Sequence, residues 1–328
     1  MHTLLYIVAF CIFILSTYSA TLPIFFQNGR ESVSSALYWD LVKYAHLIDI
    51  SYCISRISKI HYPFECDNSC SDFPNTELVY QWNSDDLNFR NLIDEFSTSG
   101  YIALNHDWKK LLIVIRGTRS FKDSIVDLNS DLVSYGDDQD GLRVHKGFYC
   151  SYLKTWNEIK HLIKFQYSKY PDYGILIMGH SMGGAIASFL TLKLNKEFDG
   201  KVFGVTMGQP MIGNDNFTTY MNHELNLKNV HKKSSKLLRI THKNDPVIKL
   251  PWRPDQYSTN VIGNVYTHSS NEVFINDLGP HLPEIENVYH CIGSTDLHCS
   301  YGKSFPNDNT EHLNYFRRMG KCGLSFFI

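Results

Sequence analysis

The stretch that most constrains this chain is Gly179-His180-Ser181-Met182-Gly183, a Gly-x-Ser-x-Gly pattern. The apolar run 175–178 before it has the length of a buried strand, and the Ala- and Leu-rich segment 185–198 after it is typical of a helix. A serine between a strand and a helix lies on a sharp, strained turn that exposes its hydroxyl. Glycines flank it because a Cβ there would collide with the neighbouring backbone. We therefore expect Ser181 to be a nucleophile; the alternative is a small-residue turn that happens to contain serine.

Strands and helices alternate through the middle of the chain, which favours βαβ units and a largely parallel sheet. The sequence predicts helices over 34–51, 144–170 and 185–198. It predicts strands over 101–104, 111–115, 175–178, 202–207 and 237–241. The first two strands should form a hairpin, as should 265–267 with 272–275, and 311–319 should form a last helical turn or two. No repeat or linker divides the chain, so we expect one α/β domain.

Residues 1–20 differ in kind from the rest. The run from Leu4 to Leu15 is almost entirely apolar but too short to span a bilayer comfortably, and small residues end it at Ala20. This pattern is typical of a secretory signal peptide, which would leave 21–328 as the domain. An uncleaved signal-anchor is the alternative, because no Lys or Arg precedes the run and Tyr18 is bulky for its place before the cleavage point. The secretory route leaves secreted, vacuolar and membrane-anchored locations open.

Composition narrows the function classes. The formal net charge is −2 and no basic block occurs, so we expect no nucleic-acid partner. Seven of the eight cysteines follow the signal segment, and in a secreted protein these favour disulfides. Cys66 with Cys70, and Cys291 with Cys299, could each close a small loop. Two of Cys53, Cys150 and Cys322 could also pair. A zinc site is the alternative, but no Cys-x-x-Cys pair occurs, and we expect no metal.

A serine hydroxyl needs a base to take its proton and an acid to orient that base. In serine hydrolases with a strand-turn-helix nucleophile, the acid and then the base follow the serine along the chain. Asp245 follows the expected strand 237–241, although Asn-Asp-Pro is also a favourable turn sequence. Its downstream rivals are Asp215, Asp255, Asp277 and Asp296. The base is one of five histidines that chain order does not separate: His268, His281, His290, His298 and His312.

From about Ser34 to Cys322 the chain resembles the fungal-type class 3 lipases, a branch of the α/β-hydrolases that includes secreted triacylglycerol lipases of filamentous fungi. Six segments carry the resemblance in order: Ile115-Arg116-Gly117-Thr118, 144–148, the serine turn, Gly208-Gln209-Pro210 with Gly213-Asn214, 239–247 with Leu250-Pro251, and 312–316. The resemblance implies a central, mostly parallel sheet flanked by helices, with a short helical lid over the active site.

The resemblance also implies the site residues. Ser181 would be the nucleophile, Asp245 the acid and His312 the base. The backbone amides of Thr118 and Met182 would form the oxyanion hole, and the Thr118 hydroxyl would add a third contact.

The lid implied by the resemblance spans Phe121 to Asp127, where 120–128 has a short amphipathic pattern of its own. Its apolar residues include Phe121 and Ile125, which suit an interface or an acyl chain. Asp127 occupies the place of an acid that, in related lipases, hydrogen-bonds the oxyanion hydroxyl once the lid opens. Ser124 stands where well-known lipases carry Trp, so one acyl-chain contact is missing.

The family's disulfides correspond to Cys53–Cys322, Cys66–Cys70 and Cys291–Cys299, which would leave Cys150 as a buried free thiol. Asn216 lies in the one glycosylation sequon, Asn216-Phe217-Thr218, which is usable if the chain enters the secretory pathway.

We therefore expect a serine carboxylesterase, best described as a lipase that hydrolyses acylglycerols through an acyl-enzyme at a lipid–water interface. No cofactor is required, and we expect a monomer. The alternative enzymes are a phospholipase A1 and a small-substrate esterase similar to feruloyl esterases, for which lid polarity is the discriminating feature. An inactive relative used as a binding or anchored membrane protein is the alternative from another class. The presence of all four residues Ser181, Asp245, His312 and Thr118 argues against it.

Overall fold

The computed structural model describes residues 26–27, 30–55, 57–83, 98–118, 131–136, 141–198, 200–227, 234–251, 265–306 and 310–323. The expected signal segment 1–20 and the expected lid 121–127 lie outside these ranges. Within them, no helix combines the length and the apolar character that crossing a membrane requires.

An eight-stranded sheet organises the described residues, in the order β14-β13-β11-β9-β8-β5-β4-β3. In chain order its strands are β3 (Thr76–Trp82), β4 (Gly100–Asn105), β5 (Lys110–Ile115), β8 (Gly174–His180), β9 (Val202–Met207), β11 (Leu237–His242), β13 (Glu272–Ile275) and β14 (Val288–His290). Strands β5, β8, β9, β11 and β13 run parallel, and antiparallel strands complete both edges. The predicted α/β-hydrolase architecture, with a mostly parallel sheet, is confirmed.

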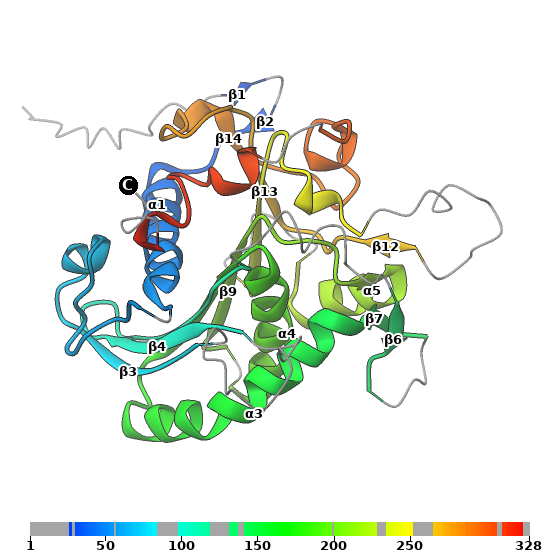
Figure 1. Cartoon of the computed structure of the whole chain (residues 1–328). Coiled ribbons are helices and arrows are strands. Elements are labelled where there is room, and N and C mark those ends of the chain that lie inside the picture. Colours follow the sequence, from blue (N-terminus) through cyan, green and yellow to red (C-terminus); the bar gives the residue numbers. More distant parts are fainter. Residues whose placement is uncertain are drawn as a thin grey trace, which may run out of the picture.

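Helices cover both faces of this sheet (Figure 1). They are α1 (Ser35–Ile50), α3 (Lys146–Lys169), α4 (Met182–Glu197) and α5 (Asp215–Glu224). Along β8, Leu176 and Met178 belong to the apolar cluster that includes α1, whereas Ile175 and Ile177 belong to the cluster that includes α3 and α4. Successive side chains of a strand point to opposite faces, so a strand covered on both sides must be apolar throughout. This explains the unbroken apolar run before the serine turn.

Two smaller sheets lie outside the main one. A four-stranded antiparallel sheet has the order β12-β10-β7-β6, and β1 (Phe26–Gln27) pairs with β2 (Arg30–Glu31). The strands of the four-stranded sheet are β6 (Leu132–Ser134), β7 (Arg143–His145), β10 (Gly213–Asn214) and β12 (Tyr266–Thr267). Short 3₁₀ helices connect the elements: η1 (Ser51–Cys53), η2 (Ser69–Asp72), η3 (Val247–Lys249), η5 (Ile285–Asn287), η6 (Ser300–Gly302), η7 (Thr310–Leu313) and η8 (Lys321–Gly323).

Two sequence predictions are wrong. The segments 265–267 and 272–275 do not form a hairpin: β12 pairs with β10, whereas β13 pairs in parallel with β11. A buried ion pair between Arg239 of β11 and Glu272 of β13, 3.0 Å apart, joins that second pair of strands. Residues 311–319 are helical only as far as Leu313, because Phe316 has a φ of 56° and the chain turns back on itself there.

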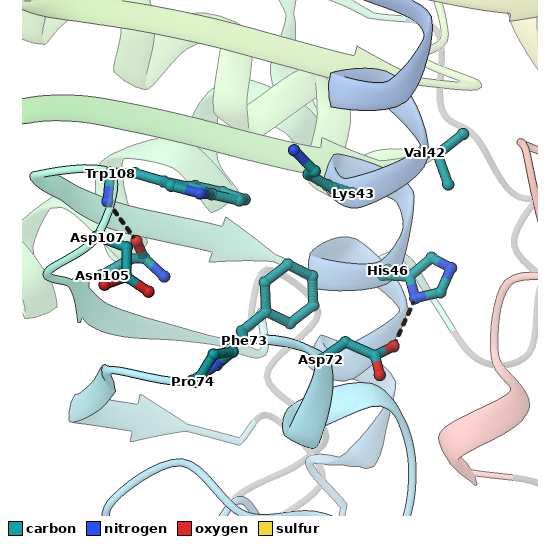
Figure 2. A pocket seen from close by; sticks show the side chains of 9 residues that line it. All are labelled: Val42, Lys43, His46, Asp72, Phe73, Pro74, Asn105, Asp107 and Trp108. Atoms are coloured by element: carbon teal, nitrogen blue, oxygen red, sulfur yellow. Dashed lines mark hydrogen bonds and ion pairs between the residues drawn. The ribbon is translucent and has the colours of Figure 1, made fainter.

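A cavity of about 280 Å³ lies between α1 and the turn that joins β4 to β5 (Figure 2). Phe73 and Trp108 line it beside Lys43 and the paired side chains of His46 and Asp72. A second cavity of about 270 Å³ also touches Trp108. Both lie near the start of β5, whereas the segment that leads to Thr118 follows the other end of that strand. No candidate catalytic residue lines either of them.

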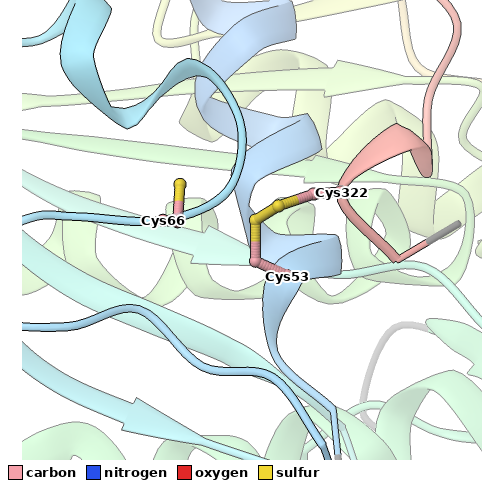
Figure 3. Close-up of side chains that lie close together, drawn as sticks. All are labelled: Cys53, Cys66 and Cys322. Atoms are coloured by element: carbon pink, nitrogen blue, oxygen red, sulfur yellow. A yellow bond between two sulfur atoms is a disulfide. The ribbon is translucent and has the colours of Figure 1, made fainter. Parts of the chain in front are cut away.

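The structure contains all three expected disulfides, Cys53–Cys322, Cys66–Cys70 and Cys291–Cys299. Cys150 is a half-buried free thiol, so its expected state is confirmed but not its full burial. The sulfur atoms of Cys53, Cys66 and Cys322 lie within 4.8 Å of one another (Figure 3). Metal binding needs deprotonated thiols, and here all three sulfur atoms belong to disulfides, which favours a structural role over a metal site.

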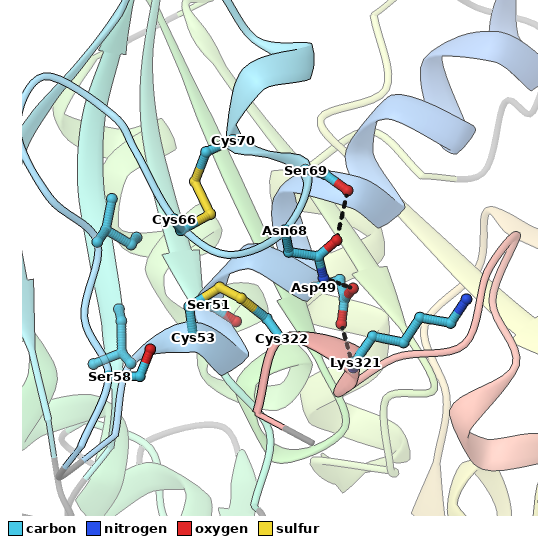
Figure 4. Close-up of a disulfide and its surroundings, with 12 residues drawn as sticks. Asp49, Ser51, Cys53, Ser58, Cys66, Asn68, Ser69, Cys70, Lys321 and Cys322 are labelled. Carbon is cyan, nitrogen blue, oxygen red and sulfur yellow. Dashed lines mark hydrogen bonds between the residues drawn. A yellow bond between two sulfur atoms is a disulfide. The ribbon is translucent and has the colours of Figure 1, made fainter. Parts of the chain in front are cut away.

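The Cys53–Cys322 disulfide ties η8 to the end of α1 (Figure 4). Asp49, a buried residue in the last turn of α1, supports the same junction. Its carboxylate accepts hydrogen bonds from the backbone amides of Gly320, at 2.6 Å, and Lys321, at 3.1 Å. The same carboxylate forms an ion pair with Arg317 at 3.0 Å. The C-terminal part of the described chain is thus held against α1 by a covalent bond and by a buried carboxylate.

We predict that the double variant Cys53→Ser/Cys322→Ser loses on the order of 5 kcal/mol of unfolding free energy. The bridge joins residues 269 apart, and a loop of that size costs the unfolded chain much entropy. Urea unfolding without reductant measures the loss. The matched control is Cys66→Ser/Cys70→Ser, whose bridge joins residues 4 apart and should cost only about 2 kcal/mol. Equal losses in the two variants would contradict the prediction.

Candidate active site

Ser181 lies on the turn between β8 and α4, with φ 57° and ψ −128°. This is a strained backbone for a residue with a Cβ, and the predicted tight turn is confirmed. A Cβ on Gly179 would lie 2.2 Å from the carbonyl oxygen of Gly183, and one on Gly183 would lie 2.3 Å from that of Ile115. The flanking glycines are therefore required by close backbone contacts, as the sequence predicts.

Asp245 and His312 lie against each other, in the loop after β11 and in η7 respectively. The Nδ1 atom of His312 is 3.0 Å from each carboxylate oxygen of Asp245, and both side chains are buried. The Tyr315 hydroxyl and the Val247 backbone amide also donate to this carboxylate, at 2.6 and 2.8 Å. A carboxylate that accepts from Nδ1–H leaves Nε2 of the imidazole as the basic nitrogen.

The Asp245 carboxylate is held in its charged form. Burial would raise its pKa, but the charge and hydrogen bond of His312, together with the donors Tyr315 and Val247, lower the pKa below its ordinary value. The carboxylate therefore remains an anion at neutral pH, which is the state that an imidazolium-orienting group needs.

His180 connects the serine turn to His312. Its Nε2 atom is 2.8 Å from the carbonyl oxygen of His312, and the two imidazole rings lie 4.6 Å apart. Its Nδ1 atom is 2.7 Å from the Tyr52 hydroxyl. Burial and the neighbouring charge of His312 lower the pKa of His180 to about 3, against the opposing effects of the His312 carbonyl and Asp245. His180 is therefore a neutral imidazole at physiological pH.

The segment Arg116-Gly117-Thr118 follows β5 and passes beside the serine. A Cβ on Gly117 would lie 3.0 Å from the Cβ of Ser181. The Thr118 hydroxyl is 3.7 Å from the Met182 sulfur, so the two expected oxyanion-hole residues lie together.

The structure gives other partners to several of the rival acids and bases that chain order left open. His281 and His298 are more than half exposed and pair with Asp277 and Asp296, at 3.2 and 3.4 Å. His268 is held by the carbonyl oxygen of Ile248. Asp255 and the lid residues Phe121, Ser124, Ile125 and Asp127 lie outside the described residues.

Sequence reasoning missed Tyr52, His180 and Tyr315 as members of the site. His180 lies inside the serine motif and Tyr315 inside the segment 312–316, so proximity to a known motif was the available signal for these two. Tyr52 gives no such signal, because 128 positions separate it from His180.

The buried neutral His180 predicts a pH dependence of stability. Its pKa is about 3 in the folded protein against an ordinary value of 6.5, so between these values the unfolded chain binds a proton that the folded chain does not. Stability should therefore fall as the pH drops from 6.5 towards 3, by up to about 1.4 kcal/mol per pH unit from this group.

We predict that His180→Gln makes the unfolding free energy less dependent on pH, because up to one fewer proton is taken up on unfolding. Urea unfolding at several pH values between 4 and 6.5 measures this slope. The control is His161→Gln, which removes an exposed histidine of α3 and should keep the wild-type slope. A wild-type slope in the His180 variant would refute the prediction.

Comparisons with known proteins agree with this geometry. The family model "Lipase (class 3)" matches residues 112–254. The secreted mono- and diacylglycerol lipase 2 of Gibberella zeae is 28% identical, over 83% of this chain and 70% of that protein. The crystal structure of the Lip2 lipase from Yarrowia lipolytica is 34% identical with a TM-score of 0.76, covering 89% of this chain and 97% of that one.

A solved triacylglycerol lipase, described as having a serine-protease triad as its catalytic centre, is 27% identical with a TM-score of 0.70; 89% of this chain and 98% of that one are covered. The segments that carry the sequence resemblance are thus part of a likeness that extends over most of the chain. The chain belongs to the class 3 lipase family and is a carboxylic ester hydrolase with the α/β-hydrolase fold.

Proposed function

We propose that this lipase hydrolyses acylglycerol esters with Ser181 as nucleophile, His312 as base and Asp245 as the acid that orients the base. The observation that carries the proposal is the buried His312–Asp245 pair, with Nδ1 3.0 Å from both carboxylate oxygens, linked through His180 to a strained serine on the β8–α4 turn. These are the parts of a nucleophilic serine site in the chain order that the fold requires.

In the proposed reaction, Nε2 of His312 takes the proton of the Ser181 hydroxyl as its oxygen attacks the ester carbonyl. The oxyanion that forms accepts hydrogen bonds from the backbone amides of Thr118 and Met182. His312, now an imidazolium stabilised by Asp245, protonates the leaving alcohol as the bond to it breaks. Water, deprotonated by His312, then attacks the acyl-enzyme, and the serine leaves with its proton restored as the acid is released. No cofactor takes part in these steps.

The relatives support an acylglycerol substrate, because one is named a mono- and diacylglycerol lipase and another a triacylglycerol lipase. The apolar residues of segment 121–127 suit action at a lipid–water interface. Phospholipase A1 and small soluble esterase activities remain the alternatives to be separated by experiment.

We also propose that the protein enters the secretory pathway as a monomer, with 1–20 as its signal segment and 21–328 as one domain. Three disulfides and a relative named as secreted support this route. Asn216 lies exposed in the first turn of α5, where an attached glycan would meet solvent.

We predict that Ser181→Ala lowers kcat by roughly 10⁴- to 10⁶-fold, because the acyl-enzyme needs this oxygen. Residues 21–328 from an oxidising host are assayed on p-nitrophenyl butyrate, emulsified triacylglycerol and phospholipid vesicles. Ser168→Ala, at an exposed serine on α3, is the control and should behave as wild type. Retained activity in the Ser181 variant would remove the nucleophile assignment.

The same assays separate the substrate classes. An acylglycerol lipase should work fastest on emulsified acylglycerol, with a rise in rate once the substrate forms an interface. Activity confined to the soluble ester would leave a small-substrate esterase, and preference for vesicles of phospholipid would leave a phospholipase.

We predict that Thr118→Val lowers kcat about 100-fold with little change in KM, since the lost hydroxyl would contact the oxyanion only as charge develops. Thr118→Ser keeps the hydroxyl and is the matched control, which should stay within a few-fold of wild type. Steady-state kinetics on p-nitrophenyl butyrate measures both. Equal kcat values for the two variants would show that the hydroxyl has no part in the oxyanion hole.

A further inference from the structure

We infer that Tyr52 is a positioning residue, which acts through His180 to set the backbone of the catalytic base His312 beside the nucleophile. The inference rests on the proposed function of Ser181 and His312. It concerns a tyrosine from the 3₁₀ turn that follows α1, far from the serine motif in sequence.

Two hydrogen bonds link the three residues in a line. The Tyr52 hydroxyl lies 2.7 Å from Nδ1 of His180, and Nε2 of His180 lies 2.8 Å from the carbonyl oxygen of His312. All three residues are buried. Because His180 directly precedes Ser181, this line joins the nucleophile's own strand to the main chain of the base.

The chemistry of the acceptor sets the direction of both bonds. A carbonyl oxygen can only accept, so Nε2 of His180 carries the hydrogen. In a neutral imidazole Nδ1 is then the acceptor, and the Tyr52 hydroxyl must donate to it. The lowered pKa of His180 agrees with a neutral ring. Tyr52 therefore stabilises the one tautomer of His180 that can hold the His312 carbonyl.

His312 is thus held at two points. Asp245 holds its ring through Nδ1, and His180 holds its backbone through the carbonyl oxygen. Without the second tether the peptide could rotate in η7 and carry the ring away from the serine. Small displacements of a base from its substrate are costly, since proton transfer requires hydrogen-bond distance.

The uncharged state of His180 also favours proton transfer to His312. Its ring lies 4.6 Å from the ring of His312, which becomes an imidazolium during each turnover. A second positive charge at that distance in a buried site would oppose proton transfer to His312. A donor on Nδ1 favours the uncharged ring, because a protonated Nδ1 could not accept from the tyrosine.

Tyr52 also contacts the segment that carries the oxyanion hole. A Cβ on Gly117 would lie 2.5 Å from the Tyr52 hydroxyl, so this oxygen packs against the glycine backbone. Two residues after Tyr52, the carbonyl oxygen of Ile54 accepts a hydrogen bond from the Arg116 guanidinium. The short segment 52–54 therefore touches both the base-holding line and the oxyanion segment.

The disulfide beside Tyr52 fixes this segment in place. Cys53, the next residue, is bonded to Cys322, which lies ten positions after His312 (Figure 4). The base and the chain that follows it are thus both anchored near Tyr52, the base noncovalently through His180 and the following chain covalently through Cys53.

The test compares kcat and KM on p-nitrophenyl butyrate, with active-site titration by a phosphonate ester to count competent enzyme. Loss of one such hydrogen bond predicts that Tyr52→Phe lowers kcat about tenfold, with KM within twofold. The matched control is Tyr101→Phe, a buried tyrosine whose hydroxyl donates to the carbonyl oxygen of Leu47 at 2.8 Å, outside the site. It should keep the wild-type kcat.

A second pair of variants tests the same line without touching Tyr52. His180→Leu removes both bonds and should lower kcat about 100-fold. His180→Gln can place an amide donor near the position of Nε2 and should recover at least about tenfold of that loss. A residue that merely fills space would not show this dependence on a donor.

The inference is overturned if Tyr52→Phe keeps kcat within twofold of Tyr101→Phe, or if the Gln variant at 180 is no better than the Leu variant. Should Tyr52→Phe fail to fold, the comparison at His180 decides alone. Ser181→Ala run in parallel keeps the two proposals apart. Its retained activity would remove the proposed function, whereas its inactivity with a normal Tyr52→Phe would remove only the role of Tyr52.

Discussion

The site depends first on how closely the backbone of α4 approaches strands β5 and β8. Gly183 touches the carbonyl oxygen of Ile115, and Gly179 touches that of Gly183, at distances that exclude any side chain. This contact forces the chain to reverse within one residue, and Ser181 takes up a left-handed conformation as a result. Apolar packing of both sheet faces sustains the strain, which a solvent-exposed loop would release. The reactive position of the serine is therefore a product of the whole sheet.

Parallel strands explain why the remaining groups gather at the same place. Strands β5, β8 and β11 are parallel, so their carboxyl ends lie on the same side of the sheet. Each is followed by a segment of the site, which contains Thr118, Ser181 and Asp245 respectively. Ligand and substrate sites of open parallel sheets form at this edge because the loops after the strands converge there. His312 comes from a different kind of segment, the four-residue 3₁₀ helix η7. It depends on buried neighbours, namely Asp245 for its ring and His180 for its backbone.

Local sequence patterns identified the elements that depend on local causes. The serine turn, the helices around it and Asp245 after β11 follow from apolar periodicity, glycine positions and chain order. Strand partners are not a local property. The sequence predicts that 265–267 and 272–275 pair with each other, whereas in the structure each pairs with a different strand. Local patterns do not choose the proposed base among five histidines, because the choice depends on which one meets Asp245 after folding. Family resemblance supplied it, whereas neither route indicated Tyr52, whose contact with His180 spans 128 positions.

The long disulfide has a consequence for when the protein becomes an enzyme. During synthesis the chain emerges with Ser181 first, then Asp245 and then His312, and domains fold as their residues become available. The disulfide that fixes the segment after the last of these groups requires Cys322 to meet Cys53, near the other end of the chain. The segment that follows His312 is therefore locked only after the chain has been made through residue 322, and only where thiols are oxidised. On the proposed secretory route, the covalent lock beside the proposed base is added late, in the compartment that forms the bond.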